Sequence, residues 1–222
     1  MSPPTGSVFV MKRLAINIIT SLVVGLAAPA TAQQLTFHYG FIGQHDDHRL
    51  YVIEDGSDLA SGSQLKLNFK YPTGSWFYVC YLSSTDEHAL LYASNTGLNV
   101  DEQAIFDTLG WLALDENSGT ETFTLIASEK RLEKLETLFN NYSKASDKSR
   151  KRFAKRIARA FGDLHKQLDQ SGTLTMAQRL DTPIIGGVTF RGVTGEEISQ
   201  HSLSHKTSGD QIAKAVFVIQ HH

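Results

Sequence analysis

The chain has 222 residues, of which 20% are charged and 41% are hydrophobic, and its formal net charge is −2. This composition is typical of a globular protein and excludes a disordered or collagen-like chain. The small net charge excludes a field over the whole molecule that would attract nucleic acid or anionic lipid.

The N-terminal segment has the pattern of a secretion signal. A basic stretch that begins at Met11 is followed by an apolar run from Leu14 to Ala28 and by an Ala-x-Ala site that ends at Ala32. These are the three regions of a signal peptide, and the apolar run is short for a membrane span. We therefore expect cleavage after Ala32 and no transmembrane segment in the mature chain.

This prediction divides the chain into two parts. Residues 1–32 are an N-terminal extension with a cleaved signal peptide, and residues 33–222 form a single domain of a size that suits one hydrophobic core. Both Met1 and Met11 are possible starts, and the basic stretch favours Met11. The signal is of the bacterial type, so the expected location of the mature protein is periplasmic or secreted.

The stretch from Trp76 to Leu82 is predicted to be the central strand. Its residues are mostly aromatic or β-branched, and both alternating faces are apolar, so we expect it in the middle of a sheet with both faces covered. Cys80 lies within it and is the only cysteine of the chain, which excludes an internal disulfide. We interpret Cys80 as a small buried hydrophobic residue rather than as a reactive nucleophile, which would need exposure and a nearby base.

Shorter strands are expected around the central one, separated by turns rich in Gly, Asp and Ser. Hydrophobic patterning predicts them at residues 35–41, 50–53, 65–70, 88–93, 111–114, 121–128, 188–193 and 214–219. We expect the last of these to be covered on both sides, because its alternating faces are both apolar. Short strands with regular turns are typical of a sandwich or barrel.

Three connections carry specific expectations. The turn at 71–74 predicts a hairpin between the strand at 65–70 and the central strand. Residues 54–58 have the composition of a turn, and 95–108 that of a loose connection.

The periodicity changes after residue 128 from that of strands to that of helices. Ser128 is the predicted N-cap of a first helix, and an apolar stripe over 153–168 predicts a second helix. Gly172 is the predicted stop. The predicted fold class is therefore mainly β: an antiparallel β-sandwich with a helical insertion at about 129–171, α+β overall.

The order of turns and strands resembles the domain of unknown function 4384. The resemblance rests on the loop at 55–62, the aromatic strand that begins at Trp76, the segment at 90–92 and the Gly-x-Glu strand that begins at Gly119. It extends over about residues 50–128. It implies a secreted β-sandwich of bacterial envelope proteins, and it implies no activity and no functional residues.

The nine histidines raise the question of a metal site. His45, Asp46, Asp47 and His48 place four possible ligands in one loop, but a metal site needs ligands that converge from more than one element. The residues that would have to complete such a site are His38, His88, His201 and His205. We predict no metal and no cofactor, and we assign no function to the terminal His221 and His222.

Sequence motifs of catalysis are absent. The chain has no Gly-x-Ser-x-Gly, His-Glu-x-x-His or Walker motif. The alternative hypothesis is an envelope hydrolase with an unrecognised active site, using Cys80 or a His–Asp pair, because triads are defined by geometry and not by sequence order.

The most distinctive feature is the strongly basic second helix. Nine Lys or Arg residues occur from Lys144 to Lys166, against Asp147 and Asp163. This face is either a solvated surface or a docking surface for an anionic envelope component or an acidic protein. The candidate contact residues are Lys148, Arg152, Lys155, Arg156 and Arg159.

These observations predict a non-enzymatic binding domain. Its expected partner is a protein or an anionic envelope component. Nucleic acid fits the charge of the helix but not the expected compartment, so we expect no nucleic-acid partner. Exposed sheet edges are the second candidate surface. The sequence does not define the oligomeric state.

Overall fold

The computed structural model describes residues 34–95, 104–170, 177–185, 188–189 and 202–222. The predicted signal peptide, the predicted stop at Gly172 and most of the strand predicted at 188–193 lie outside these residues. Within them, the chain forms two β-sheets and two helices.

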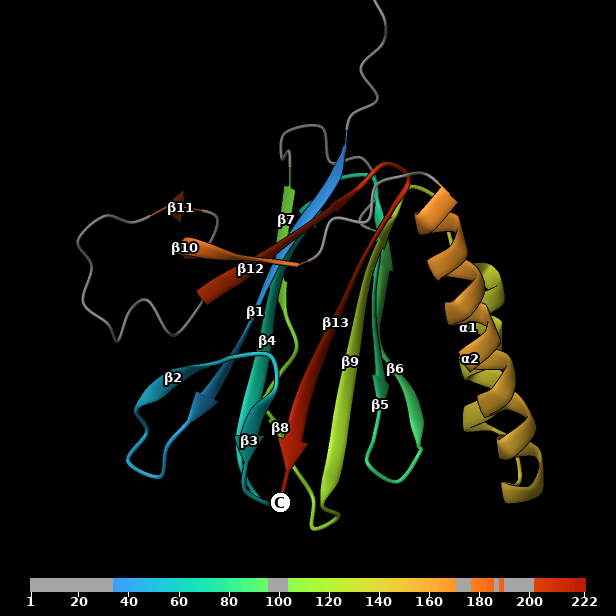
Figure 1. The fold of residues 1–222 in the computed structure, drawn as a ribbon, viewed down its shortest axis with the longest axis horizontal. Coiled ribbons are helices and arrows are strands. Elements are labelled where there is room, and N and C mark those ends of the chain that lie inside the picture. The colour runs from blue at the N-terminus through green and yellow to red at the C-terminus, as the bar shows by residue number, and fades with distance from the viewer. Residues whose placement is uncertain (1–33, 96–103, 171–176, 186–187, 190–201) are drawn as a thin grey trace, which may run out of the picture. The chain divides into compact units, whose positions relative to one another are not determined.

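Eight strands form the first sheet (Figure 1). Along its path they are β11 (Val188–Thr189), β10 (Gln178–Ile185), β12 (Ser202–Gly209), β1 (Leu35–Gln44), β4 (Gln64–Pro72) and β7 (Ala104–Thr108), with β2 (Leu50–Ile53) beside β1 and β8 (Leu112–Ala113) beside β4. All of these neighbours are antiparallel.

Five strands form the second sheet. Their order is β3 (Ser57–Leu59), β13 (Ile212–His221), β9 (Gly119–Ser128), β5 (Trp76–Leu82) and β6 (His88–Asn95). The pairing of β3 with β13 is parallel, and the others are antiparallel.

The two sheets pack face to face around an aromatic core. Apolar side chains at alternate positions of both sheets point into the space between them, as expected for sheets that each bury one face. The rings of Phe41 and Phe217 stack with centroids 4.2 Å apart, and those of Phe69 and Phe77 with centroids 4.8 Å apart. These ring pairs join strands of different sheets and so hold the two layers together.

Two helices, α1 (Glu133–Ser143) and α2 (Asp147–Gln170), cover part of the outer face of the second sheet (Figure 1). Tyr78, Cys80 and Ile126 of that face pack with Leu138 and Ile157 of the helices in a second core. The central strand, β5, is therefore buried on both faces, as its double apolar pattern predicts. The predicted β-sandwich with a helical insertion is confirmed.

The predicted hairpin between β4 and β5 is wrong, because the two strands belong to different sheets. The turn at Thr73 and Gly74 carries the chain from the first sheet to the second. Tyr71 and Phe77 then face each other across the core, with ring centroids 4.8 Å apart. A hairpin and such a crossing use the same turn residues, so the turn composition does not distinguish them.

Ser128 is not the N-cap of the first helix. It ends β9, and α1 begins at Glu133. The start of the helix is held instead by the Tyr78 hydroxyl, which accepts the N–H of Leu132 at 2.8 Å and donates to Glu136 at 3.0 Å. This contact ties the helix to the sheet that it covers.

Four strands are not predicted by the sequence: β3, β7, β10 and β12. β3 falls in the expected turn at 54–58 and β7 in the expected connection at 95–108. β12 is rich in Ser, His and Thr, yet it pairs with β1 and is largely buried. The sequence does not predict this strand, because its residues are mostly polar and show no alternation of apolar and polar side chains.

The expectation that the last strand is covered on both sides is also wrong. Alternate residues of β13 such as Ala215 and Phe217 are buried between the sheets, but Val216 on the other face is 43% exposed. The helices do not extend over this part of the second sheet, and the apolar side chain faces the solvent.

Candidate functional site

Helix α2 is fixed to the sandwich by one face. Ile157 and Ala160 are buried and Phe161 is half-buried, and all three pack with α1 and with the outer face of the second sheet. Their spacing is that of one side of an α-helix, so the predicted apolar stripe is confirmed. Burial of this stripe holds the opposite side of α2 toward the solvent.

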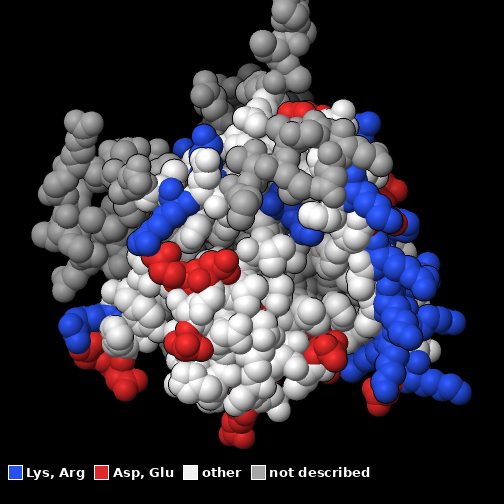
Figure 2. All heavy atoms as spheres, in the orientation of Figure 1, with Lys and Arg blue, Asp and Glu red and all other residues white. Residues whose placement is uncertain are grey.

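The opposite side of α2 is strongly basic. Six cations line one shallow hollow on the helix, and all six are exposed; Figure 2 shows the blue Lys and Arg side chains along this side of the molecule. They are Lys148, Lys151, Arg152, Lys155, Arg156 and Arg159. All five predicted contact residues belong to this set, and the structure adds Lys151. We call these six residues the basic face.

None of the six cations of the basic face forms an ion pair with a described carboxylate. Among the described residues, the ion pairs of α2 are those of Arg150, whose guanidinium lies 3.8 Å from both Glu87 and Asp147. The guanidinium carbons of Arg152 and Arg156 lie 5.3 and 5.7 Å from the centre of the Phe153 ring. This contact orients the two side chains without cancelling their charge. The six positive charges therefore face the solvent.

Cys80 has the environment of a structural residue. It is 2% exposed beneath the helices, and burial raises the pKa of its thiol, which disfavours the reactive thiolate. Its interpretation as a buried hydrophobic residue is confirmed, and the part of the hydrolase hypothesis that relied on it loses its support.

The described residues of the metal hypothesis do not converge. The His45 ring lies on Tyr51 with centroids 4.4 Å apart, and the Asp47 carboxylate is 2.6 Å from the Arg49 guanidinium. His38 and His205 lie on the first sheet, His88 lies on the second, and His201 is outside the described residues. In the described ranges, no three His, Cys, Asp or Glu side chains are placed to hold a metal ion.

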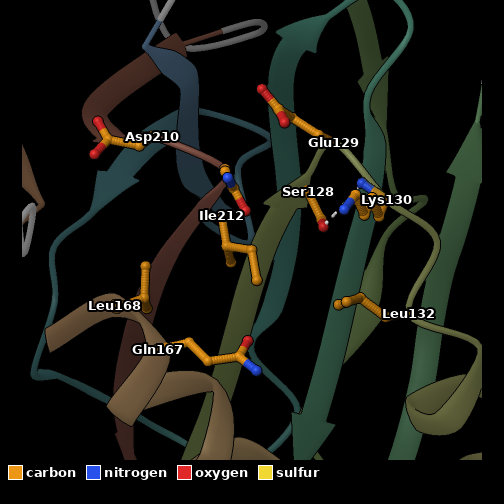
Figure 3. A pocket seen from close by; sticks show the side chains of 9 residues that line it. Ser128, Glu129, Lys130, Leu132, Gln167, Leu168, Asp210 and Ile212 are labelled. Carbon is orange, nitrogen blue, oxygen red and sulfur yellow. Dashed lines mark hydrogen bonds between the residues drawn. The ribbon is translucent and has the colours of Figure 1, made fainter. Parts of the chain in front are cut away.

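A cavity of about 560 Å³ lies where the C-terminal part of α2 meets the ends of β9 and β13 (Figure 3). Its charged residues are Glu129, Lys130 and Asp210, and Leu132 and Ile212 supply apolar surface. Charges of both signs stand at its rim, so the lining favours neither an anionic nor a cationic ligand. We assign it no function.

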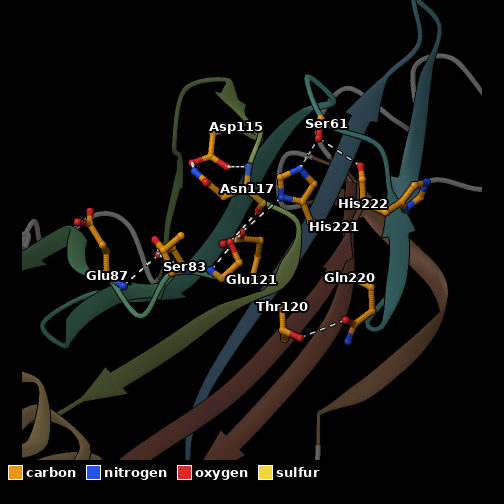
Figure 4. A network of polar contacts seen from close by, with 12 residues as sticks. Ser61, Ser83, Glu87, Asp115, Asn117, Thr120, Glu121, Gln220, His221 and His222 are labelled. Atoms are coloured by element: carbon orange, nitrogen blue, oxygen red, sulfur yellow. Dashed lines mark hydrogen bonds and ion pairs between the residues drawn. The ribbon is translucent and has the colours of Figure 1, made fainter.

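A buried polar cluster that the sequence does not predict lies at one end of the core between the sheets (Figure 4). Glu121 of β9 and His221 of β13 are only 2% and 4% exposed. Ser61, in the turn after β3, contacts His221. One feature of the sequence indicates this cluster. Glu121 alternates in phase with the core residues Phe123 and Leu125, so its side chain must point into the core.

No protein-family model, no curated protein and no solved structure matches the chain. The resemblance to the domain of unknown function 4384 therefore stays a prediction. None of the helices in the described ranges combines the length and the apolar character that a membrane crossing requires.

Proposed function

We propose that this protein is a non-enzymatic binding domain, periplasmic or secreted, that docks on an anionic surface of the bacterial envelope through the basic face of α2. The observation that supports the proposal is the basic face itself. Six exposed cations stand together, and none of them forms an ion pair with a described residue, on a helix whose other side is fixed to the sandwich. The whole chain carries −2, so the attraction comes from this local field.

Docking of this kind is electrostatic and peripheral. In the described part of the chain the large hydrophobic side chains that are strongly exposed are Trp111 and Val216, and neither belongs to α2. Without an apolar anchor beside the cations, the helix has nothing to insert among acyl chains. Binding should therefore weaken with salt, because the screening length falls from about 10 Å at 0.1 M to about 3 Å at 1 M.

The geometry favours a flat anionic surface over an acidic protein. From Lys148 to Arg159 the cations extend about 16 Å along the helix axis, at a rise of about 1.5 Å per residue. A planar leaflet contacts such a row along its whole length, whereas a protein partner needs an acidic surface shaped to fit the helix. We therefore propose the envelope surface as the partner and treat an acidic protein as an outcome of the test.

The test is cosedimentation of the mature chain with vesicles of phosphatidylcholine, with and without phosphatidylglycerol, at low and at high salt. One variant replaces four residues of the basic face by Gln: Arg152, Lys155, Arg156 and Arg159. The matched control removes the same number of charges elsewhere: Lys66, Lys70, Lys130 and Lys206.

We expect the wild-type chain and the control to bind the anionic vesicles and to leave them at high salt, and the α2 variant to stay in solution. Binding by the α2 variant at the wild-type level, or binding that salt does not weaken, overturns the proposal. Capture of wild-type chain by immobilised poly-glutamate together with no vesicle binding shifts the assignment to an acidic protein partner.

A further inference from the structure

Ser61, His221 and Glu121 form a chain of polar contacts that leads from the surface into the core (Figure 4). The Ser61 Oγ lies 3.0 Å from His221 Nε2, and His221 Nδ1 lies 3.5 Å from Glu121 Oε1. Parallel pairing of β3 with β13 brings Ser61 to His221, since Leu59 pairs with His221. Antiparallel pairing of β13 with β9 brings Glu121 to the same place, since it pairs with Ile219. The N–H of Ser61 donates to the His222 carbonyl at 2.9 Å and holds the turn in place.

The Glu121 carboxylate is held in a fixed orientation. The Tyr81 hydroxyl donates to Oε2 at 2.5 Å, and the Ser84 N–H donates to Oε1 at 3.3 Å. Burial and the neighbouring Glu121 raise the pKa of Tyr81, so its hydroxyl stays a donor. A carboxylate in an apolar core is costly unless such donors satisfy it, and its retention there calls for a reason.

The position of Glu121 selects the form of the His221 ring. His221 Nδ1 is buried, has no hydrogen-bond partner and faces the carboxylate. A carboxylate on this side favours the N–H on Nδ1, which leaves Nε2 free to accept. The Ser61 hydroxyl then has two acceptors within reach, His221 Nε2 at 3.0 Å and the His222 carbonyl at 3.2 Å, and only the first can serve as a base. These are the roles of nucleophile, base and orienting group in a serine triad.

Ser61 is accessible from the solvent. It is exposed, whereas the His221 side chain behind it is fully buried. The next residue, Gly62, has φ +80, and a Cβ there would meet no atom within 4 Å. The turn is therefore open at Gly62, next to the exposed Ser61 side chain.

We propose that Ser61 is a nucleophilic serine, activated by His221 and oriented through Glu121, that accepts an acyl group from an activated ester. The Ser61 Oγ bonds to the ester carbonyl carbon while its proton passes to His221 Nε2. The bond from that carbon to the leaving oxygen then breaks, and this oxygen takes the proton from the imidazolium. Glu121 stabilises the positive ring between the two transfers. The products are acyl-Ser61 and a free alcohol.

The turn does not form an oxyanion hole. The N–H groups of Ser61, Gly62 and Ser63 donate to the carbonyls of His222, Leu114 and Ala60. One such donor contributes about 10²- to 10³-fold to the rate in a serine protease. The site should therefore react with activated esters alone and keep the acyl group. It is a covalent acceptor without turnover, which agrees with the non-enzymatic domain proposed above and uses none of the residues of the basic face.

The test is reaction of the mature chain with p-nitrophenyl acetate. We expect a burst of p-nitrophenolate that does not exceed one per chain, and peptide mass spectrometry should place the acetyl group on Ser61. Ser61→Ala should lose the burst, and His221→Gln should slow it by about 10²-fold or more, as loss of a general base does. The matched control is Ser63→Ala, in the same turn but without a histidine partner, which should keep the burst.

Acetylation confined to lysines, or acetylation of Ser61 at an unchanged rate in His221→Gln, overturns the proposal. Circular dichroism checks the fold of each variant. If His221→Gln is unfolded, the variant Glu121→Gln tests the proposal in its place. This substitution keeps the shape of the side chain and an acceptor for the Tyr81 hydroxyl, so we expect the variant to fold. A burst slowed at least about ten-fold in this variant supports the orienting role, and a burst at the wild-type rate contradicts it.

Discussion

The molecule has two polar regions of opposite kinds. On the basic face of α2, charges of one sign stand in solvent and come from twelve consecutive positions, 148–159. In the cluster of Ser61, Glu121 and His221, the carboxylate and the imidazole are buried behind an exposed serine, and the three residues come from distant parts of the chain. Water stabilises each exposed charge separately, whereas the buried groups depend on one another. The first region should therefore tolerate substitution without loss of folding, and the second should not.

The largest effect is expected from Glu121→Ala. The change removes the acceptor of the Tyr81 hydroxyl and of the Ser84 N–H, and it leaves a gap beside buried His221. Loss of a buried, hydrogen-bonded carboxylate of this kind should lower the free energy of unfolding by about 2–4 kcal/mol. Urea denaturation measures it, with the exposed Glu116→Ala as control. A Glu121 variant as stable as the control would contradict the distinction between the two regions.

Acid pH should give an intermediate effect, through buried and half-buried histidines that belong to neither region. Burial lowers the pKa of His38, His88 and His205 from the ordinary value of about 6.5. Below that pH the unfolded chain binds protons that the folded chain resists. Stability should therefore be complete above about pH 6.5 and decline as the pH falls below it.

Thermal melting at pH 7 and pH 5 tests this expectation. His88→Gln should reduce the difference between the two melting temperatures, because His88 lies against the rings of Phe139 and Tyr142 and its partners stay in place. An equal difference in both proteins would show that His88 does not contribute.

The smallest effect on stability is expected from the four Gln substitutions on the basic face. Like charges three or four residues apart on a helix repel one another, so their removal should leave the urea midpoint unchanged or raise it slightly. The same variant should lose vesicle binding. A marked fall in the midpoint would mean that these side chains serve the fold, and the vesicle result would then no longer report on docking alone.

The basic face could be predicted because the information for it is local. The stripe that contains Ile157 and Phe161 and the cations around it repeat at helical spacing within one segment, so the sequence predicts both the helix and its exposed side. The strand β5 was equally predictable, because seven residues show both of its buried faces. In each case, residues that are close in the sequence determine the structure of the element, so contacts with distant parts of the chain are not needed to predict it.

The buried cluster could not be predicted, because strand pairing creates it. Ser61 and His221 are 160 positions apart, and the parallel pairing of β3 with β13 that joins them has no marker in composition. The predicted hairpin between β4 and β5 is wrong for a similar reason. The turn between these strands suits a hairpin and a crossing between sheets equally well, and only the strand pairing distinguishes them. Glu121 was the one visible anomaly, a charged residue in phase with Phe123.

The place of β13 in the second sheet has a consequence for how the protein is made. This strand separates β3 from β9, although it follows all the other described strands in the chain. Residues 212–221 leave the ribosome after the strands that they join, so this sheet is completed late. Non-local pairing of this kind is slow to form. A nascent chain that lacks them presents an open β9 edge, which invites pairing with other chains.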